Sequence, residues 1–429
     1  MKSMGENFLE EVLDHIKSKE AKILVEKELS CHLNQSKNEW ITQGWSQAEA
    51  EEKAVMQMGS ASKLGIQFNK LHRPKVDWLL LFLFAAAIGM GFLPVLSPQD
   101  IYPGELIIHR QALFVVISVI TALAMMFFDY RKLHKFSWIF LACGIALLYI
   151  LAFHPNASIN GRPYIIMAGT GISISGITAL PFLFLFWASY FSKSQPKFWL
   201  VVFTFLTTIF LFMLLPNLPV IMIYSILVFM LFWGSSVRQK IKYMTAAAAA
   251  LLSAAFLTLF WFTTEGYQKL RILSFLNPGK YSQNEGFQYL QVKKMMSSGG
   301  WSGAHTQELS TTDMLTDFVF VNITYHYGWI TAGLLVLILL LLAVRMVTIS
   351  RLIKDRFGRQ LVLGVISLFS VQFLYNVGMT LGLFPFISIS LPFISHGLTP
   401  ALLNSFLIGV ALSVYRRKNF SLGKHSESV

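Results

Sequence analysis

The chain has 429 residues, of which 55% are hydrophobic and only 13% are charged. Soluble domains carry about a quarter charged residues, so this composition excludes a protein whose whole surface faces water. The net charge is +13, but residues 1–76 hold 11 basic and 11 acidic residues, so the whole excess lies in residues 77–429. There the cations occupy short loops between apolar runs. That pattern indicates membrane topology and argues against a nucleic-acid-binding patch.

Residues 5–33 favour helix formation, because they are rich in charged helix formers and contain no Gly or Pro beyond the first position. Ser46 and Glu49 have the spacing of a capping box, which predicts a second helix start, and Gly59 suits its end. No apolar core of a signal peptide precedes the first long apolar run. Residues 1–72 are therefore predicted to form a small cytoplasmic helical domain.

From residue 77 onward, apolar runs of membrane-spanning length alternate with short loops. Every second loop is basic, so the positive-inside rule predicts an even number of spans with both chain ends in the cytoplasm. The predicted fold class is all-α: a polytopic membrane protein with about ten transmembrane helices and a small soluble N-terminal domain. A cytoplasmic tail, 417–429, would follow the membrane domain. The predicted spans are 77–96, 111–129, 136–153, 175–192, 197–215, 217–235, 243–263, 319–345, 360–384 and 395–416.

One predicted outside loop, residues 264–318, is too long for a connector and too polar for a span. Asp317 lies at its end, directly before an apolar run. Asp is a preferred N-cap residue, so Asp317 can simply cap the next helix. A partly desolvated carboxylate at the membrane interface also has a raised pKa and can act as a general base. The residues themselves leave both interpretations open.

Other candidate residues on the predicted outer side carry two interpretations each. Arg162 can bind a phosphate group through its planar fork or contact a lipid headgroup. Gly299 and Gly300 permit close backbone approach to a ligand, or they belong to an ordinary flexible loop. His396 precedes a predicted span, where a histidine is more often a hydrogen-bonded packing residue than a catalyst. Residues 285–298 are predicted to form an amphipathic segment on the outer membrane surface.

Four ordered stretches resemble motifs of the SEDS family (shape, elongation, division and sporulation), the group of FtsW, RodA and SpoVE. The resemblance covers about residues 77–416. Weaker similarities lie at Asn160–Arg162 and Leu215–Leu218. The four stretches are Asn277-Pro278 with Gly286–Gln291; Ser298–Gly303; Thr316–Phe320 with Tyr327-Gly328; and Asn376–Met379 with Gly382–Pro385 and Leu391–Gly397.

SEDS proteins are lipid II polymerases. They join the disaccharides of an undecaprenyl-pyrophosphate-linked precursor into peptidoglycan strands at the outer face of the bacterial cytoplasmic membrane, usually with a class B penicillin-binding protein as partner. The family's catalytic Asp matches Asp317, so the resemblance implies that Asp317 deprotonates the acceptor sugar hydroxyl that attacks C1 of the donor. It allows a divalent cation, Mg²⁺ or Mn²⁺, and implies no other cofactor. The substrate-binding residues that it implies are Arg162, Gln288, Lys293, Lys294, Gly299, Gly300, Ser395 and His396.

The chain departs from the family motifs at several acidic positions. The motif EELG reads Tyr325-His326-Tyr327-Gly328, and no Glu occurs within 172–178, where the family has one. Two functions stay open: a polymerase with an altered site, or a non-catalytic scaffold or regulator of a penicillin-binding protein. A flippase for the lipid-linked precursor is a third hypothesis. The loss of ionisable groups from the membrane disfavours it, because transporters keep such groups.

The N-terminal residues resemble a helical prefix domain attached to some Gram-positive permeases. The similar positions include Glu28-Leu29, Gly44-Trp45-Ser46 and Met58-Gly59. This resemblance implies a regulatory or docking module and no chemistry.

Overall fold

A computed structural model describes the protein, and it shows two compact units. The N-terminal unit comprises Met1–Asp77 together with Tyr415–Val429, and the membrane unit comprises Trp78–Val414. The predicted cytoplasmic tail lies outside the described residues from position 420 onward, as do parts of the predicted outside loop. The structure describes residues 3–97, 104–159, 161–167, 172–263, 266–283, 286–304 and 313–419.

Four helices build most of the N-terminal unit. The segment predicted to favour helix over 5–33 is divided by a turn, because Ser18 caps a new helix by accepting a hydrogen bond from the backbone of Ala21. The capping box predicted at Ser46 and Glu49 is confirmed. A buried apolar cluster from α1–α4 forms the core. The helices are α1 (Met4–Asp14), α2 (Lys19–Thr42), α3 (Gln47–Met58) and α4 (Ala61–Leu71).

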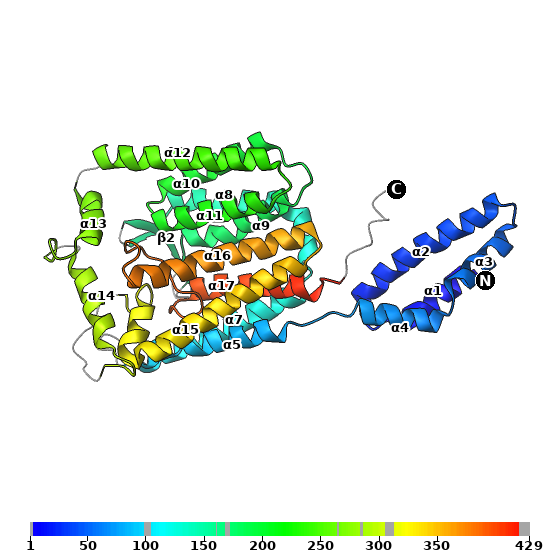
Figure 1. Ribbon diagram of the computed structural model, residues 1–429, viewed down its shortest axis with the longest axis horizontal. Coiled ribbons are helices and arrows are strands. Elements are labelled where there is room, and N and C mark those ends of the chain that lie inside the picture. Colours follow the sequence, from blue (N-terminus) through cyan, green and yellow to red (C-terminus); the bar gives the residue numbers. More distant parts are fainter. Residues whose placement is uncertain are drawn as a thin grey trace. The chain divides into compact units, whose positions relative to one another are not determined.

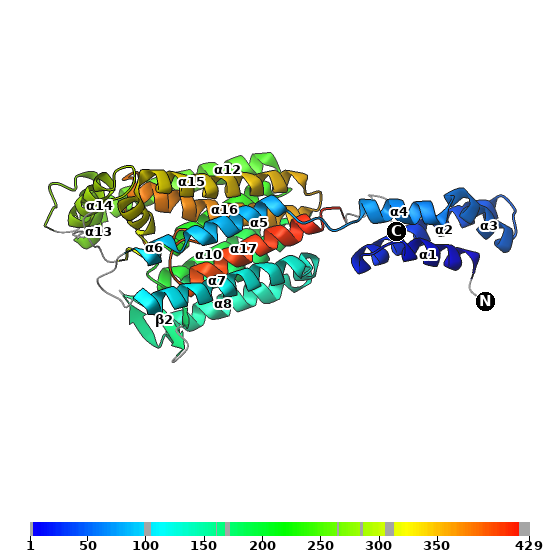
Figure 2. The same cartoon turned by 90° about the horizontal axis from the view of Figure 1, so that it is seen from below.

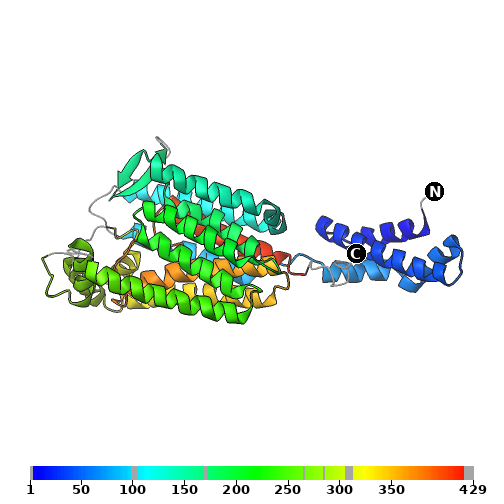
Figure 3. The same ribbon diagram turned by 90° about the horizontal axis from the view of Figure 1, so that it is seen from above.

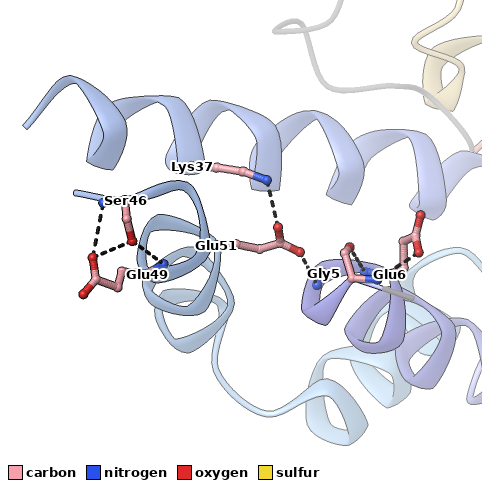
Figure 4. Close-up of polar contacts among 7 residues, drawn as sticks. Gly5, Glu6, Lys37, Ser46, Glu49 and Glu51 are labelled. Atoms are coloured by element: carbon pink, nitrogen blue, oxygen red, sulfur yellow. Dashed lines mark hydrogen bonds and ion pairs between the residues drawn. The ribbon is translucent and has the colours of Figure 1, made fainter. Parts of the chain in front are cut away.

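Glu51 links three of these helices through polar contacts (Figure 4). Its carboxylate lies 2.8 Å from Nζ of Lys37 on α2 and accepts a 2.9 Å hydrogen bond from the backbone N–H of Gly5 on α1. The hydrogen bond from Lys37, followed by those from Gly5 and Ser3, lowers the pKa of Glu51 to about 2. An ionised Glu51 therefore stabilises the packing of α1, α2 and α3.

The membrane unit is a helical bundle with one small sheet (Figures 1 and 3). Its elements follow the chain as α5 (Trp78–Met90), α6 (Leu93–Leu96), α7 (Gly104–Phe127), η1 (Tyr130–Phe136), α8 (Ser137–Phe153), β1 (Ala157–Ile159), β2 (Arg162–Met167), β3 (Ile172–Ile174), η2 (Gly176–Ala179), α9 (Leu180–Phe191), α10 (Phe198–Leu214), α11 (Leu218–Gly234), α12 (Gln239–Thr263), α13 (Tyr267–Leu276), α14 (Gly286–Ser298), α15 (Val319–Leu352), α16 (Arg356–Thr380) and α17 (Leu398–Arg416).

Six helical stretches in the described part of the chain are long and apolar enough to cross a membrane. Three shorter apolar helices and α12 lie at the other positions predicted from hydropathy. The all-α, multi-pass membrane fold is confirmed, and the number of ten crossings stays a prediction. The six stretches are Trp78–Leu96, Leu106–Phe127, Tyr130–Phe153, Val319–Leu352, Arg356–Thr380 and Leu398–Arg416, and the shorter helices are Gly176–Phe191, Phe198–Leu214 and Leu218–Gly234.

Helix α9 forms much of the centre of the bundle. Ten of its side chains are buried, and it packs against α8, α11 and α16. The indole N–H of Trp187 donates a 2.9 Å hydrogen bond to the hydroxyl of Tyr224 on α11, so a polar group at the centre is satisfied inside the protein. Helix α9 therefore contributes many of the buried side chains at the core of the bundle.

The basic loops meet at one end of the bundle. The Tyr130 hydroxyl bonds to Asp355 before α16, and the Ser189 hydroxyl bonds to His134 in η1. Ser236, after α11, donates to the carbonyl oxygen of Lys193. These contacts connect four of the loops whose cations predicted one membrane face. The cations in these loops and at the adjoining helix ends are Arg131, Lys132, Lys135, Lys193, Lys197, Arg238, Lys240, Lys242, Arg351, Lys354, Arg356 and Arg359.

The opposite end carries the sheet and the short helices α13 and α14 (Figures 1 and 2). The sequence predicted no strands here, yet β1, β2 and β3 form an antiparallel sheet in that order. Asn156 closes its edge by donating to and accepting from the backbone of Ile166. The Thr399 hydroxyl donates to the carbonyl oxygen of Ser173, which joins β3 to the start of α17. The predicted site residues gather at this end.

Candidate functional site

Asp317 lies in a tight turn before α15. The carbonyl oxygen of Asp313 accepts hydrogen bonds from the backbone N–H groups of Thr316 and Phe318, both at 3.1 Å. Asp313 has a φ of 66°, in the left-handed region that Asp tolerates better than most residues. The N-cap residue of α15 is Phe318. The interpretation of Asp317 as a helix cap is therefore wrong, because the turn places its side chain ahead of the cap position.

The Asp317 carboxylate is partly buried and has a raised pKa. Burial raises the pKa to about 6, and the negative charge of Asp313 adds to the increase. A hydrogen bond from the Ser388 side chain and the positive charge of Arg162 act in the opposite direction. A carboxyl group with this pKa is largely ionised near neutral pH and is basic enough to accept a proton from a reacting group.

Asn376 on α16 holds the backbone around this carboxylate. Its side-chain amide donates to the carbonyl oxygens of Asp317 at 2.9 Å and of Ile389 at 2.6 Å. Because Ser388 directly precedes Ile389, the same amide group positions both the carboxylate and its hydroxyl donor. Asn376 is fully buried. Asn376 belongs to one of the ordered motifs, but no role was predicted for it or for Ser388.

Tyr289 on α14 supports the loop that carries Ser388. Its ring stacks on Phe386 with centroids 3.9 Å apart, and its hydroxyl accepts a 2.9 Å hydrogen bond from the backbone N–H of Phe386. The hydroxyl of Tyr375 donates to the carbonyl oxygen of Pro385 in the same loop. These contacts fix the segment before Ser388 from two helices.

Ser395 and His396 fasten the other side of the Asp317 turn. The Ser395 hydroxyl donates to the carbonyl oxygen of Thr316 at 2.6 Å. The backbone N–H of His396 donates to the carbonyl oxygen of Leu315 at 2.7 Å. The imidazole of His396 bonds to Gln111. Both residues thus contact the turn that carries Asp317, and their direct substrate contacts stay a prediction.

The environment of His396 favours a neutral imidazole. Burial, followed by the positive charge of Arg110, lowers its pKa. Its Nδ1 lies 2.7 Å from Oε1 of Gln111, and its ring lies 5.3 Å from that of Phe114. These contacts are those of a hydrogen-bonded packing residue.

Arg162 reaches the site from the sheet. It is the first residue of β2 and pairs with Ile159 across the turn from β1. Its charge lowers the pKa of Asp317, so the two side chains are close enough to interact electrostatically. The structure therefore places Arg162 within electrostatic range of Asp317, although 154 positions lie between them in the sequence.

Helix α14 carries three further predicted residues. Lys293 and Lys294 are exposed and Gln288 is half-buried, whereas the opposite face of the helix is buried. Among the described residues, neither lysine is hydrogen-bonded to Asp317. The predicted substrate-binding role of these three residues stays a prediction.

The glycines after α14 allow its end to pack tightly against α15. A Cβ atom on Gly299 would lie 2.3 Å from the carbonyl oxygen of Thr324, and one on Gly328 would lie 2.3 Å from that of Trp301. Gly328 also has non-helical backbone angles, which bend α15 at this point. Close packing is thus a sufficient reason for Gly299, while Gly300 is exposed. Ligand binding by both glycines stays a prediction.

Tyr325, His326 and Tyr327 occupy the position where the resemblance placed two carboxylates. The Tyr327 hydroxyl donates a 2.9 Å hydrogen bond to the carbonyl oxygen of Leu93, the first residue of α6. Tyr325 is fully buried and its ring lies 5.0 Å from that of His326. Tyr327 therefore joins α15 to α6, and no carboxylate side chain occurs at these three positions.

In the described part of the chain, no group of three or more His, Cys, Asp or Glu side chains is arranged to hold a metal ion. Asp313 and Asp317 form a pair of carboxylates at the site. Mg²⁺ is commonly bound by one or two carboxylates together with substrate phosphates. The residues are therefore compatible with a cation that arrives with a phosphorylated substrate.

Comparison with known proteins extends these observations. The family model FTSW_RODA_SPOVE, described as cell cycle protein, matches residues 77–420. The probable peptidoglycan glycosyltransferase FtsW of Geobacter metallireducens is 25% identical over 382 residues, which cover 82% of this chain and 98% of that protein. Stage V sporulation protein E of Bacillus subtilis is 30% identical over 159 residues, which cover 36% of this chain and 43% of that protein.

Solved structures show the same fold. A chain from a peptidoglycan synthase complex that coordinates polymerization and crosslinking is similar with a TM-score of 0.68 at 21% identity, covering 80% of this chain and 98% of that chain. RodA, the rod shape determining protein of Thermus thermophilus, gives a TM-score of 0.59 at 20% identity, covering 80% of this chain and 97% of that one. With its family match, its helical bundle and its Asp317 site, the chain belongs to the FtsW/RodA/SpoVE family of cell cycle proteins.

Proposed function

We propose that the chain is a peptidoglycan glycosyltransferase that polymerises lipid II, with Asp317 as its general base. The observation that supports this most strongly is the environment of the Asp317 carboxylate. It is partly buried, has a pKa of about 6 and lies within electrostatic range of Arg162. The curated relatives named peptidoglycan glycosyltransferase agree with this reaction class.

The reaction follows from the placement of these groups. The ionised Asp317 takes the proton from a hydroxyl of the acceptor sugar, and the oxygen of that hydroxyl forms a bond to C1 of the donor sugar. The bond between C1 and the pyrophosphate oxygen breaks, and the pyrophosphate leaves with the electron pair. The guanidinium of Arg162 stabilises the negative charge that develops on this leaving group.

The nearby Asp317 carboxylate also stabilises the partial positive charge that develops at C1 of the donor sugar. Asn376 fixes the backbone of Asp317 through its hydrogen bond to the carbonyl oxygen, and the Ser388 side chain lowers the pKa of the carboxyl group. A base held within a narrow range of positions reacts faster than a mobile one, because less order must be created in the transition state.

The proposed location is the bacterial cytoplasmic membrane, with the Asp317 end outside. The basic loops meet at the opposite end of the bundle, and positively charged loops remain in the cytoplasm. Both chain termini would then be cytoplasmic. Lipid-linked sugars displayed at the outer surface could reach Asp317 without leaving the headgroup layer.

The proposed protein partner is a class B penicillin-binding protein. Support comes from the similarity to one chain of a peptidoglycan synthase complex that coordinates polymerization and crosslinking. A divalent cation is also part of the proposal. Asp313 would hold it beside the pyrophosphate, where it would supply positive charge to the leaving group.

A non-catalytic scaffold or regulator is the second candidate. The sequence Tyr325-His326-Tyr327 favours it, since the resemblance placed two carboxylates there and these positions have none. A flippase is the third and least favoured candidate. A transporter needs ionisable groups at membrane depth, and the chain has lost acidic residues of the family motifs there.

Assays of the purified full-length protein with lipid II distinguish the three functions. Glycan product formed by the protein alone supports the polymerase. Capture of a penicillin-binding protein without any product supports the scaffold. Movement of lipid II across liposome membranes without product supports the flippase. An inactive protein with neither partner nor transport would contradict all three.

A further inference from the structure

A cavity of about 520 Å³ opens in the N-terminal unit, outside the site described above. Three chain segments line it, and all of them belong to that unit. They are the turn between α1 and α2, the end of α4 with the residues that follow it, and the last residue of α17. The lining residues are Lys17, Ser18, Lys19, Glu20, Asn69, Arg73, Pro74 and Arg416.

Polar contacts hold the three segments together. The guanidinium of Arg417 donates two hydrogen bonds to the Glu20 carboxylate, at 2.9 and 3.0 Å, and its side chain is only 1% exposed. The backbone N–H of Lys75 donates to the carbonyl oxygen of Arg416, and that of Lys17 donates to the side chain of Asn69. The walls of the cavity are therefore built by specific contacts and do not result from a chance approach of loops.

The charge of the lining is strongly positive. Four of its eight residues are cations, Lys17, Lys19, Arg73 and Arg416. The carboxylate of the lining, Glu20, is compensated by its two-bond pair with Arg417. The first turn of α2 also contributes the positive end of a 24-residue helix. Such a concentration of like charge is unfavourable on its own, and an anion in the cavity would relieve it.

Two of these cations adjoin the ends of candidate membrane spans along the chain. Arg416 is the last residue of the span Leu398–Arg416, and Arg73 precedes the span Trp78–Leu96 by five positions. Two of the four cations thus lie where a chain enters or leaves the lipid headgroup layer. Arginine side chains there suit phosphate groups, because their planar forks can bind two oxygens at once.

We propose that this cavity binds a phosphate-bearing anion between Lys19, Arg73 and Arg416. The phosphate comes either from the headgroup of an anionic phospholipid or from a free phosphate compound in solution. Binding would cross-link α2, the segment after α4 and the end of α17, so it would couple the N-terminal helices to the end of the last span. This inference does not depend on the proposed polymerase function.

Isothermal titration of the full-length protein in detergent tests the proposal. The probes are inorganic phosphate and dihexanoyl phosphatidylglycerol at constant ionic strength, with zwitterionic dihexanoyl phosphatidylcholine as the control lipid. The test variant is Lys19→Glu with Arg73→Glu. The matched control is Lys27→Glu with Lys63→Glu, which reverses two exposed cations of the same unit outside the lining.

We expect saturable binding of at least one anionic probe, weakened about tenfold or more in the test variant, or about 1.4 kcal/mol, and unchanged in the control variant. Tighter binding of phosphatidylglycerol than of phosphate identifies a lipid headgroup site, and the reverse order identifies a soluble ligand. The proposal is overturned if neither probe saturates, or if both variants weaken binding equally. Equal binding of phosphatidylcholine and phosphatidylglycerol would also overturn it, since acyl chains would then explain the signal.

Discussion

The side-chain amide of Asn376 donates a 2.9 Å hydrogen bond to the backbone carbonyl oxygen of Asp317, across 59 positions of sequence. The same nitrogen also bonds to Ile389, next to the Ser388 hydroxyl that contacts the Asp317 carboxylate. One buried amide thus determines where both the base and its hydrogen-bond donor lie. Asn376 is a positioning residue, because it acts on the proposed reaction only through the backbone of Asp317.

Replacing this amide should reduce the rate of polymerisation more than the stability of the fold. In Asn376→Leu, both carbonyl oxygens lose their donor, and the Asp317 turn gains freedom. A displacement of about 1 Å at a reacting group costs on the order of 100-fold in rate, so we expect a 10- to 100-fold lower kcat with a smaller change in KM. Initial rates with lipid II measure the split between kcat and KM.

Thr380→Val is the matched control for that variant. Thr380 lies one turn further along α16 and is also buried. Its hydroxyl donates to carbonyl oxygens of its own helix, at Asn376 and Val377. Its loss should leave the rate within about twofold, because helix backbone carbonyls already have partners. Equal losses in the two variants would mean that Asn376 has a general structural role.

The pH dependence of the rate should follow the ionisation of Asp317. Since the base must be ionised, a pKa of about 6 predicts a rate that falls about tenfold per pH unit below that value. Asp313→Asn removes a negative charge and should shift the midpoint to lower pH. Ser388→Ala removes a hydrogen bond to the carboxylate and should shift it to higher pH. Asn at position 313 tolerates the left-handed backbone there.

The opposite directions of these two shifts make the prediction specific. Rates at saturating lipid II between pH 5 and 8 give the midpoints. Two shifts of the same sign, or a wild-type profile without a midpoint near 6, would show that another group controls the rate.

Gly299→Ala should disturb the packing of α14 against α15. Its Cβ atom would lie 2.3 Å from the carbonyl oxygen of Thr324, so one of the two backbones has to move. We expect a loss of more than about 1 kcal/mol of stability, as for other overpacked sites. Gly333→Ala on the same α15 meets no atom within 4 Å and should be neutral or stabilising. Thermal unfolding in one detergent compares the two.

Glu51→Gln should weaken the N-terminal unit. The carboxylate bonds to Lys37 and to the backbone of Gly5, and hydrogen bonds to an ionised group contribute about 1.5–3 kcal/mol. The folded pKa of about 2 lies below the ordinary 4.5, so this stabilisation is present above pH 4.5 and is lost as the pH falls toward 2. The exposed neighbour Glu52 is the control position.

Hydrogen exchange of α1–α3 in the full-length protein measures this effect. Exchange should be faster in Glu51→Gln than in Glu52→Gln at pH 7, and the difference should shrink below pH 4.5. A difference that persists at pH 2 would assign the effect to packing and not to charge.

The sequence predicted the local features of this fold well. Apolar runs located the helices of the bundle, because membrane-spanning length and composition are properties of single segments. The capping box at Ser46 was equally local, since its two partners are three residues apart. The turn at Ser18 was harder to predict, because several residues between 5 and 33 favour helix without marking where one helix ends.

The site was only partly predictable. The motif resemblance located Asp317 and Arg162, which the structure brings together. The sheet that carries Arg162 was not predicted. Strands of three to six residues have too few side chains to show the alternation of apolar and polar residues that identifies a strand. The Ser388 contact was missed for a different reason. It depends on how the loop after α16 folds back over Asp317, and no spacing in the sequence encodes that approach.

The most direct test of the central claim is lipid II polymerisation by purified protein carrying Asp317→Asn, compared with the wild type in the same membrane mimetic. Asn keeps the size and hydrogen-bonding capacity of the side chain but cannot take up the proton. The wild type should form glycan strands, and the variant should form at least about 1,000-fold fewer per unit time while unfolding at the same temperature. Strand synthesis at the wild-type rate by the variant would contradict the assignment of Asp317 as the general base.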